Sequence, residues 1–138
     1  VIINATVGDV DVFSLIVDSP EAFGNFMRIR GGAVVQSLNL GFKMMIEEEQ
    51  ESVLATFIAE IQSKFGDLSK EVIVPFLPDT QFDGVEFKVP VRGEKLSLLE
   101  LSARNAKEMR LTRMPELLLS RYREAGDENV KILKKYAP

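Results

Sequence analysis

Residues 9–18, DVDVFSLIVD, constrain the fold of this chain more than any other segment. The segment is short and rich in β-branched and aromatic residues, which favours a β-strand. From Val12 to Val17, apolar residues occupy both alternating sets of positions, and alternate residues of a strand face opposite sides of its sheet. The pattern therefore predicts a strand that is buried on both faces and lies centrally in its sheet.

Two further strands are expected directly after this one. Residues 22–30 follow an Asp-Ser-Pro turn, and Gly31-Gly32 separates them from residues 33–43. A pair of glycines between two strand-like runs is typical of a two-residue β-hairpin. We therefore expect three consecutive antiparallel strands.

The next expected element is an amphipathic helix. Glu47, Glu48 and Glu49 precede it, and acidic residues are favourable near a helix N-terminus because of the helix dipole. Apolar residues then recur at helical spacing up to Gly66, which is expected to end the helix; they are Val53, Leu54, Phe57, Ile58, Ile61 and Phe65.

Two short strands and a second helix are expected in the remainder. Residues 71–76 and 85–89 are short apolar runs bounded by prolines and a polar loop. The second helix opens near Glu94, and Pro115 breaks or kinks it. Beyond it, residues 116–123 and 128–136 are expected to form two short helices, the second with a basic end at Lys131, Lys134 and Lys135.

This order of elements predicts an α/β fold. Right-handed crossovers leave few arrangements, and the ribonuclease H-like mixed sheet is our first choice: a three-strand antiparallel meander, then helix-strand units, with helices packed on the sheet. The stretch between Phe76 and Val85 is too short for a full helix. Either it is a bare loop between neighbouring strands, or the last two strands pair differently. We expect one domain over residues 1–114 and a helical tail or linker over 115–138.

Composition removes several kinds of chemistry. The 138 residues include no Cys and no His, so disulfides, thiolate sites, the usual zinc ligands and Ser-His or Cys-His nucleophiles are excluded. We expect no cofactor, no metal and a cytoplasmic location. No apolar run approaches the length of a membrane span, so no membrane partner is expected.

Charge is distributed unevenly along the chain. The net charge is −4, with 6 basic and 14 acidic residues in 1–89 but 11 basic and 7 acidic residues in 90–138. A basic half of this kind suits nucleic acid, whereas the alternative is that Lys and Arg solvate helix faces.

The candidate DNA-binding residues lie at the start of the second helix and along it. Free backbone N–H groups and the helix dipole favour a phosphate there, and a spacing of three residues places several cations on a shared face. In the alternative interpretation, Arg92 caps a strand or pairs with Glu94 or Glu100. The candidates are Arg92, Gly93, Lys95, Arg104, Lys107, Arg110 and Arg113.

Carboxylates offer a weaker hypothesis. A two-metal nuclease site on this fold needs acids on the first strand, the first helix and the end of the fourth strand. Asp9, Asp11, Glu60 and Asp79 match those positions poorly. We interpret Asp9 and Asp11 as solvated acids at the strand entrance, and the acids of residues 47–51 as an exposed helix start. No catalytic and no metal-binding residue is therefore predicted.

Four ordered segments carry a resemblance to a known family. GDVDVFS, RIRGGAVVQ, EVIVPF and VPVRGEKLSLLELSARNA together resemble UvrC, the component of excinuclease ABC that incises DNA, over about residues 1–110. The last segment keeps Pro90, Arg92, Gly93 and Lys95, although Val91 stands where the family usually has Gln. The chain starts abruptly at Val1, which we interpret as a piece of a longer protein.

The resemblance implies a place and a role. The region would follow the GIY-YIG nuclease and UvrB-binding segments of UvrC and precede its endonuclease and helix-hairpin-helix domains, so both active sites would lie elsewhere. Its partners would be the DNA phosphate backbone, read with little sequence specificity, together with UvrB and the other UvrC domains. The expected function is a non-catalytic DNA-positioning domain for the dual incisions of nucleotide excision repair. The alternative is interdomain packing without DNA contact, and a metal-dependent nuclease is disfavoured.

Overall fold

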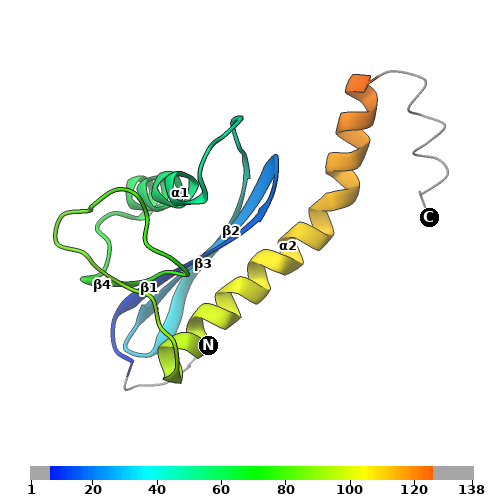
Figure 1. Ribbon diagram of the computed structural model, residues 1–138. Helices are drawn as coiled ribbons and strands as arrows, with labels where there is room; N and C mark the ends of the chain where they lie inside the picture. The colour runs from blue at the N-terminus through cyan, green and yellow to red at the C-terminus, as the bar shows by residue number, and fades with distance from the viewer. Residues whose placement is uncertain (1–6, 126–138) are drawn as a thin grey trace. The chain divides into compact units, whose positions relative to one another are not determined.

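The computed structural model describes residues 7–125, and the side chains of residues 7–112. The chain divides into two compact units, Val1–Lys107 and Glu108–Pro138. The elements in chain order are β1 (Val10–Asp18), β2 (Glu21–Arg30), β3 (Ala33–Lys43), α1 (Gln50–Phe65), β4 (Glu71–Ile73), β5 (Glu86–Lys88) and α2 (Gly93–Ala125) (Figure 1). The second unit is described only as the continuation of α2.

The strands form one mixed sheet in the order β3-β2-β1-β4-β5. β1 is antiparallel to β2, and β2 is antiparallel to β3. β4 is parallel to β1, and β5 is parallel to β4. The predicted meander followed by helix-strand units is confirmed, with β1 in the middle of the sheet. β4 and β5 are neighbours joined by a segment in which no helix is described, which is the first of the two alternatives considered from the sequence.

The face of the sheet toward α1 is an aromatic core. The ring of Phe13 on β1 lies 5.1 Å from that of Phe26 and 5.3 Å from that of Phe57, the latter edge-on. These side chains are fully buried, and each contributes about 1.5–3 kcal/mol through removal from water. A Cβ at Gly24 of β2 would lie 2.4 Å from Phe57 Cε2, so α1 approaches the sheet closely where β2 has no side chain.

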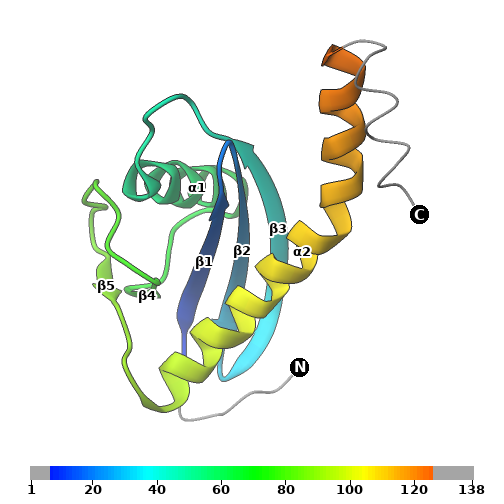
Figure 2. The same cartoon turned by 45° about the vertical axis from the view of Figure 1, so that its right-hand side comes forward.

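The face toward α2 is aliphatic and carries a buried polar cluster. Leu98 and Leu99 of α2 pack on Val10, Val12 and other aliphatic side chains of the sheet, which are Met27, Ile29 and Ile73. Ser102 Oγ lies 2.9 Å from Ser14 Oγ and 2.7 Å from Asn25 Oδ1. α1 and the first part of α2 therefore cover opposite faces of the sheet (Figure 2).

The sequence predicts a break or a kink at Pro115, and the break is absent, since one helix is described from Gly93 to Ala125. Residues 116–123, expected as a separate short helix, lie within α2. A proline inside a helix removes one backbone hydrogen bond, and this loss does not end α2. The expected helix 128–136 and its lysines lie outside the described residues, and the boundary at residue 114 stays a prediction. Within residues 7–125, neither helix combines the length and hydropathy that a membrane span requires.

Candidate functional site

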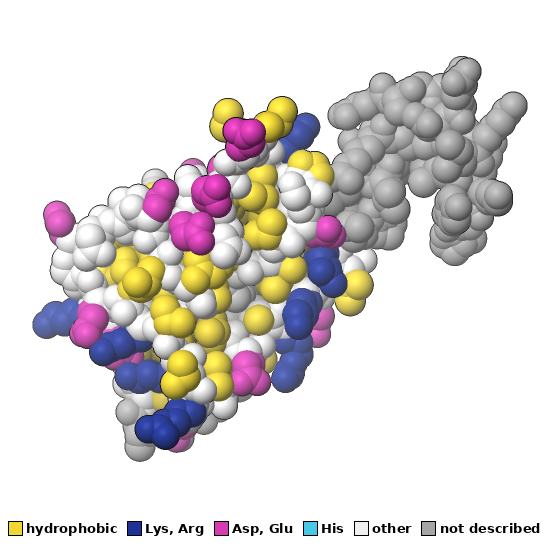
Figure 3. Space-filling model, in the orientation of Figure 1, with side chains coloured by type: hydrophobic (Ala, Val, Ile, Leu, Met, Phe, Trp, Pro, Cys, Tyr) yellow, Lys and Arg dark blue, Asp and Glu magenta, His cyan; other side chains and the backbone are white. Residues whose placement is uncertain are grey.

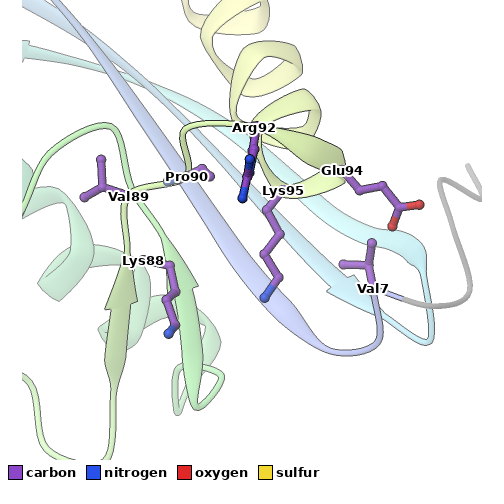
Figure 4. A pocket seen from close by; sticks show the side chains of 7 residues that line it. All are labelled: Val7, Lys88, Val89, Pro90, Arg92, Glu94 and Lys95. Atoms are coloured by element: carbon purple, nitrogen blue, oxygen red, sulfur yellow. The ribbon is translucent and has the colours of Figure 1, made fainter.

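A groove of about 460 Å³ lies at the start of α2. It is bounded by the end of β5, the connection that follows, the first turn of α2 and Val7 (Figure 4). Three of its lining side chains are cationic and one is a carboxylate; the full lining is Val7, Lys88, Val89, Pro90, Arg92, Glu94 and Lys95. The groove therefore brings together two of the predicted residues, Arg92 and Lys95, and adds Lys88.

Local sequence explains why three cations meet here. Lys88 is the last residue of β5, and Pro90, which has no N–H, cannot extend the strand ladder. Gly93 has φ 83°, a left-handed conformation that glycine adopts without strain. The chain therefore turns sharply from β5 into α2. Lys88, Arg92 and Lys95 follow one another along that turn, and in Figure 4 their side chains extend in the same direction.

Two of the three cations are paired with glutamates of the sheet. Lys88 Nζ lies 2.8 Å from Glu86 Oε1, and Lys95 Nζ lies 2.7 Å from Glu71 Oε2. Glu71 and Glu86 stand opposite each other on β4 and β5. The hydrogen bond to Glu86, reinforced by its charge, raises the pKa of Lys88, and the same contacts lower the pKa of Glu86.

Arg92 differs from both lysines. It is exposed, and among the residues that the structure describes no carboxylate forms an ion pair with it. Arg92 is therefore the cation of the groove for which the described residues show no ion pair. The pairing with Glu94 or Glu100, considered as an alternative interpretation, is not among those ion pairs.

The other predicted cations lie elsewhere on α2. Arg104 and Lys107 line a separate hollow of about 270 Å³ together with Glu100 and Ala103. Nine residues separate Lys95 from Arg104, which is two and a half helical turns, so the two residues point to opposite sides of α2. Arg92 and Lys95 therefore line one hollow, and Arg104 and Lys107 line another. Arg110 is half-buried in the second unit, and the side chain of Arg113 lies outside the described ones.

Asp11 is not a solvated acid at the strand entrance, and that prediction is wrong. Asp11 is fully buried. It accepts hydrogen bonds from Arg28 Nε at 3.0 Å, from Arg28 Nη2 at 3.3 Å and from the backbone N–H of Ser69 at 2.8 Å. Arg30 Nη1 lies 3.6 Å from the same carboxylate.

The rest of the Arg28 guanidinium is also occupied. It donates to the carbonyl oxygens of Phe65 at 3.0 Å and Asp67 at 3.1 Å, at the end of α1. The carboxylate is therefore neutralised inside a closed hydrogen-bonded cluster. Sequence reasoning missed this cluster, although the hairpin register could have revealed it, because Asp11 and Arg28 are direct partners on β1 and β2.

The remaining carboxylates considered from the sequence stay apart. Asp9 Oδ1 accepts a hydrogen bond from the Gly31 N–H at 2.8 Å, which holds the β2–β3 turn. Glu60 and Asp79 are exposed on other elements. Within the described part of the chain, no three acidic side chains gather closely enough to hold a metal ion.

The mixed sheet, with a helix on each face, defines the class as a ribonuclease H-like α/β domain. The family described as "UvrC Ribonuclease H-like domain" matches residues 9–113. This chain belongs to the UvrC family.

Curated relatives agree with this assignment. The UvrABC system protein C of Flavobacterium psychrophilum is 37% identical over 84% of this chain and 19% of its own length. That of Bacteroides thetaiotaomicron is 34% identical over 83% of this chain and 19% of its own length. The chain therefore spans about one fifth of the length of these relatives.

A solved structure, the catalytic domain of human Endonuclease V, gives a TM-score of 0.35 at 15% identity, over 51% of this chain and 35% of that one. A similarity of this size adds nothing to the assignment.

Proposed function

We propose that this chain is a non-catalytic segment of UvrC that positions DNA for incision during nucleotide excision repair in the cytoplasm. The observation that carries the proposal is the convergence of Lys88, Arg92 and Lys95 on one groove at the start of a long helix. Helix N-termini favour phosphate through their free N–H groups and dipole, and Arg binds phosphate in a bidentate geometry. Contacts of this kind carry no sequence information, which suits repair of varied lesions.

The buried cluster around Asp11 supports the non-catalytic part of the proposal. A two-metal nuclease needs carboxylate oxygens that are free to bind cations. Both oxygens of Asp11 instead accept hydrogen bonds from Arg28, and one also accepts the Ser69 N–H. A metal ion at Asp11 would have to displace a buried guanidinium. We expect no cleavage of duplex or single-stranded DNA by this chain with Mg²⁺ or Mn²⁺.

One observation favours a second candidate function, packing against UvrB or other UvrC domains without DNA contact. Glu86 and Glu71 already neutralise Lys88 and Lys95. A groove whose lysines are internally paired attracts phosphate less than one with three free cations. In this alternative, Val89 and Val91, which are exposed, contact a protein surface.

Fluorescence anisotropy of a labelled damaged duplex, titrated with this chain at two salt concentrations, separates the two functions. If the groove positions DNA, the chain should bind the duplex. The logarithm of the binding constant should then fall linearly with the logarithm of the salt concentration, with a slope of about −0.9 for each neutralised phosphate. Arg92→Ala/Lys95→Ala should abolish most of that binding. Lys43→Ala/Lys64→Ala removes the same charge from β3 and α1 and serves as the matched control.

Two outcomes would contradict DNA positioning by the groove. One is absence of binding at low salt, which would leave the packing function. The other is an equal loss in the groove variant and the control variant, which would indicate general charge attraction. Arg104→Ala/Lys107→Ala tests the separate hollow on α2 in the same assay.

A further inference from the structure

The connection between β3 and α1 forms an apolar tip surrounded by acids. The tip consists of Met45, Ile46 and Glu47. Ile46 is 96% exposed and Met45 is 77% exposed, while the preceding Met44 packs on the α1 core. Figure 3 shows hydrophobic and acidic side chains, with a cationic side chain beside them, at the top of the described part of the chain. Soluble domains seldom present adjacent large apolar side chains so fully unless another surface covers them.

Backbone contacts hold the tip in this conformation. The Met44 N–H donates to the Pro20 carbonyl at 2.7 Å, and the Glu48 N–H donates to the Met45 carbonyl at 3.1 Å. The Glu48 side chain also accepts from the Met45 N–H at 3.3 Å. Glu47 has φ 63°, a left-handed conformation that is unfavourable for a residue with a side chain. The turn thus directs two apolar side chains outward in spite of local backbone strain.

A third exposed apolar residue, Leu77, lies at the same end of α1. The Asp79 N–H donates to the Glu51 carbonyl at 3.3 Å, which brings the loop containing Leu77, 58% exposed, to the first turn of α1. The acids of this end are Glu47, Glu48, Glu49, Glu51 and Asp79. This concentration of negative charge repels phosphate, so the surface suits a protein partner with a basic rim and not DNA.

The small size of the surface indicates whether its partner is a separate protein or another part of the same chain. Three exposed apolar side chains are far fewer than the roughly 20–30 residues a side in a stable interface between separate proteins. A tether raises the effective concentration of two such surfaces to about the millimolar range, so a small contact suffices within one chain. The matched part of this chain covers only 19% of the length of such a relative.

We propose that the tip docks into an apolar recess edged by Lys and Arg on another domain of the longer UvrC chain. This inference rests on the proposed role as a UvrC segment. It concerns the acidic surface at the start of α1 and not the groove proposed to bind DNA. The domain would then contact DNA through the start of α2 and its own protein through the start of α1.

Photo-crosslinking tests the proposal in full-length UvrC without DNA. Ile46→p-benzoylphenylalanine should give crosslinks within one chain, to an apolar segment flanked by Lys or Arg outside this region. The same probe at Val35, which is 54% exposed on β3, is the matched control and should give few. Crosslinks to a second copy, to UvrB added to the reaction, or to no protein would each overturn the proposal.

Charge reversal provides a second measurement. Glu47→Lys/Glu49→Lys places cations against the basic rim, so the crosslink yield from position 46 should fall at least about tenfold. An unchanged yield would contradict the proposed rim. Both glutamates are exposed, so the fold should survive, which the thermal unfolding of the variant checks. Because no DNA is present, failure here is distinguishable from failure of the groove to bind DNA.

Discussion

The two faces of the sheet bury different kinds of polar groups. On the α1 face, Asp11 and Arg28 form an ion pair inside an aromatic core. On the α2 face, Ser14, Asn25 and Ser102 form a cluster of uncharged groups among aliphatic side chains. Breaking a buried ion pair is strongly destabilising although the pair adds little net stability, whereas the loss of a neutral hydrogen bond destabilises less. The α1 face is thus the more vulnerable to a single polar substitution.

Removal of one charge from the α1 face should give the largest effect. Arg28→Ala leaves the Asp11 carboxylate buried without its main partner, which we expect to lower the free energy of unfolding by about 3–5 kcal/mol. Urea denaturation followed by circular dichroism measures this. Arg30→Ala also deletes a guanidinium, but Arg30 lies farther from Asp11, at 3.6 Å, and its side chain is 34% exposed. A loss as large in Arg30→Ala as in Arg28→Ala would refute the assignment of Arg28 as the principal partner.

Replacement of both charges sharpens the same point. Asp11→Asn/Arg28→Met removes the ion pair without leaving a lone charge, so it should recover most of the stability lost in Arg28→Ala. No recovery would mean that the hydrogen bonds to Phe65 and Asp67, and not the charge of Asp11, dominate the energetics.

The α2 face should respond less. Ser102→Ala removes the hydroxyl that lies near Ser14 and Asn25, and the expected loss is about 1–3 kcal/mol in the same denaturation experiment. Asn25 retains its bond from Nδ2 to Asn39 Oδ1, 2.7 Å long, which limits the damage. Ser97→Ala, an exposed serine of the same helix, is the control and should leave stability nearly unchanged. If Ser102→Ala and Arg28→Ala lowered the free energy of unfolding equally, the proposed difference between the two faces would be wrong.

The smallest effect on folding is expected at the exposed Glu86–Lys88 pair. The pKa of Glu86 lies below its usual 4.5, so its contribution to stability is present above that value and is lost as pH falls through the lowered pKa. The pKa of Lys88 lies above its usual 10.5, so its contribution is present below that value and is lost as pH rises through the raised pKa. At neutral pH, Glu86→Gln should therefore barely change stability but should strengthen DNA binding by releasing Lys88. Weaker DNA binding in this variant would argue that Glu86 orients Lys88 for its ligand.

The fold could be predicted from local patterns because the spacing of apolar residues in a strand indicates which of its faces are buried. Apolar residues on both sides of residues 12–17 indicated a central strand, and Gly31-Gly32 indicated the hairpin. The segment between Phe76 and Val85 is too short for a full helix, so its length alone predicted that no helix would form there. The break considered at Pro115 is absent from α2, because the propensity of one residue does not decide whether a long helix ends there.

The site was harder to predict because its contacts join distant segments. Lys95 meets Glu71 across 24 positions, and Asp11 meets Arg28 through a strand register that local patterns do not determine. The sequence did identify Arg92 and Lys95 as neighbours at a helix start. It did not identify Lys88, because that residue belongs to β5 and not to the helix on which the candidates were sought.

The Asp11–Arg28 contact also has a consequence for how the chain reaches this structure. The two residues are direct partners in the β1–β2 hairpin. A slip of one residue would turn Arg28 toward the opposite side of the sheet, among the aliphatic side chains beneath α2. A slip of two would keep its side but leave its charge unmatched. The pair therefore discriminates against misaligned hairpins during folding, a selective role that its modest net contribution to the finished structure would not reveal.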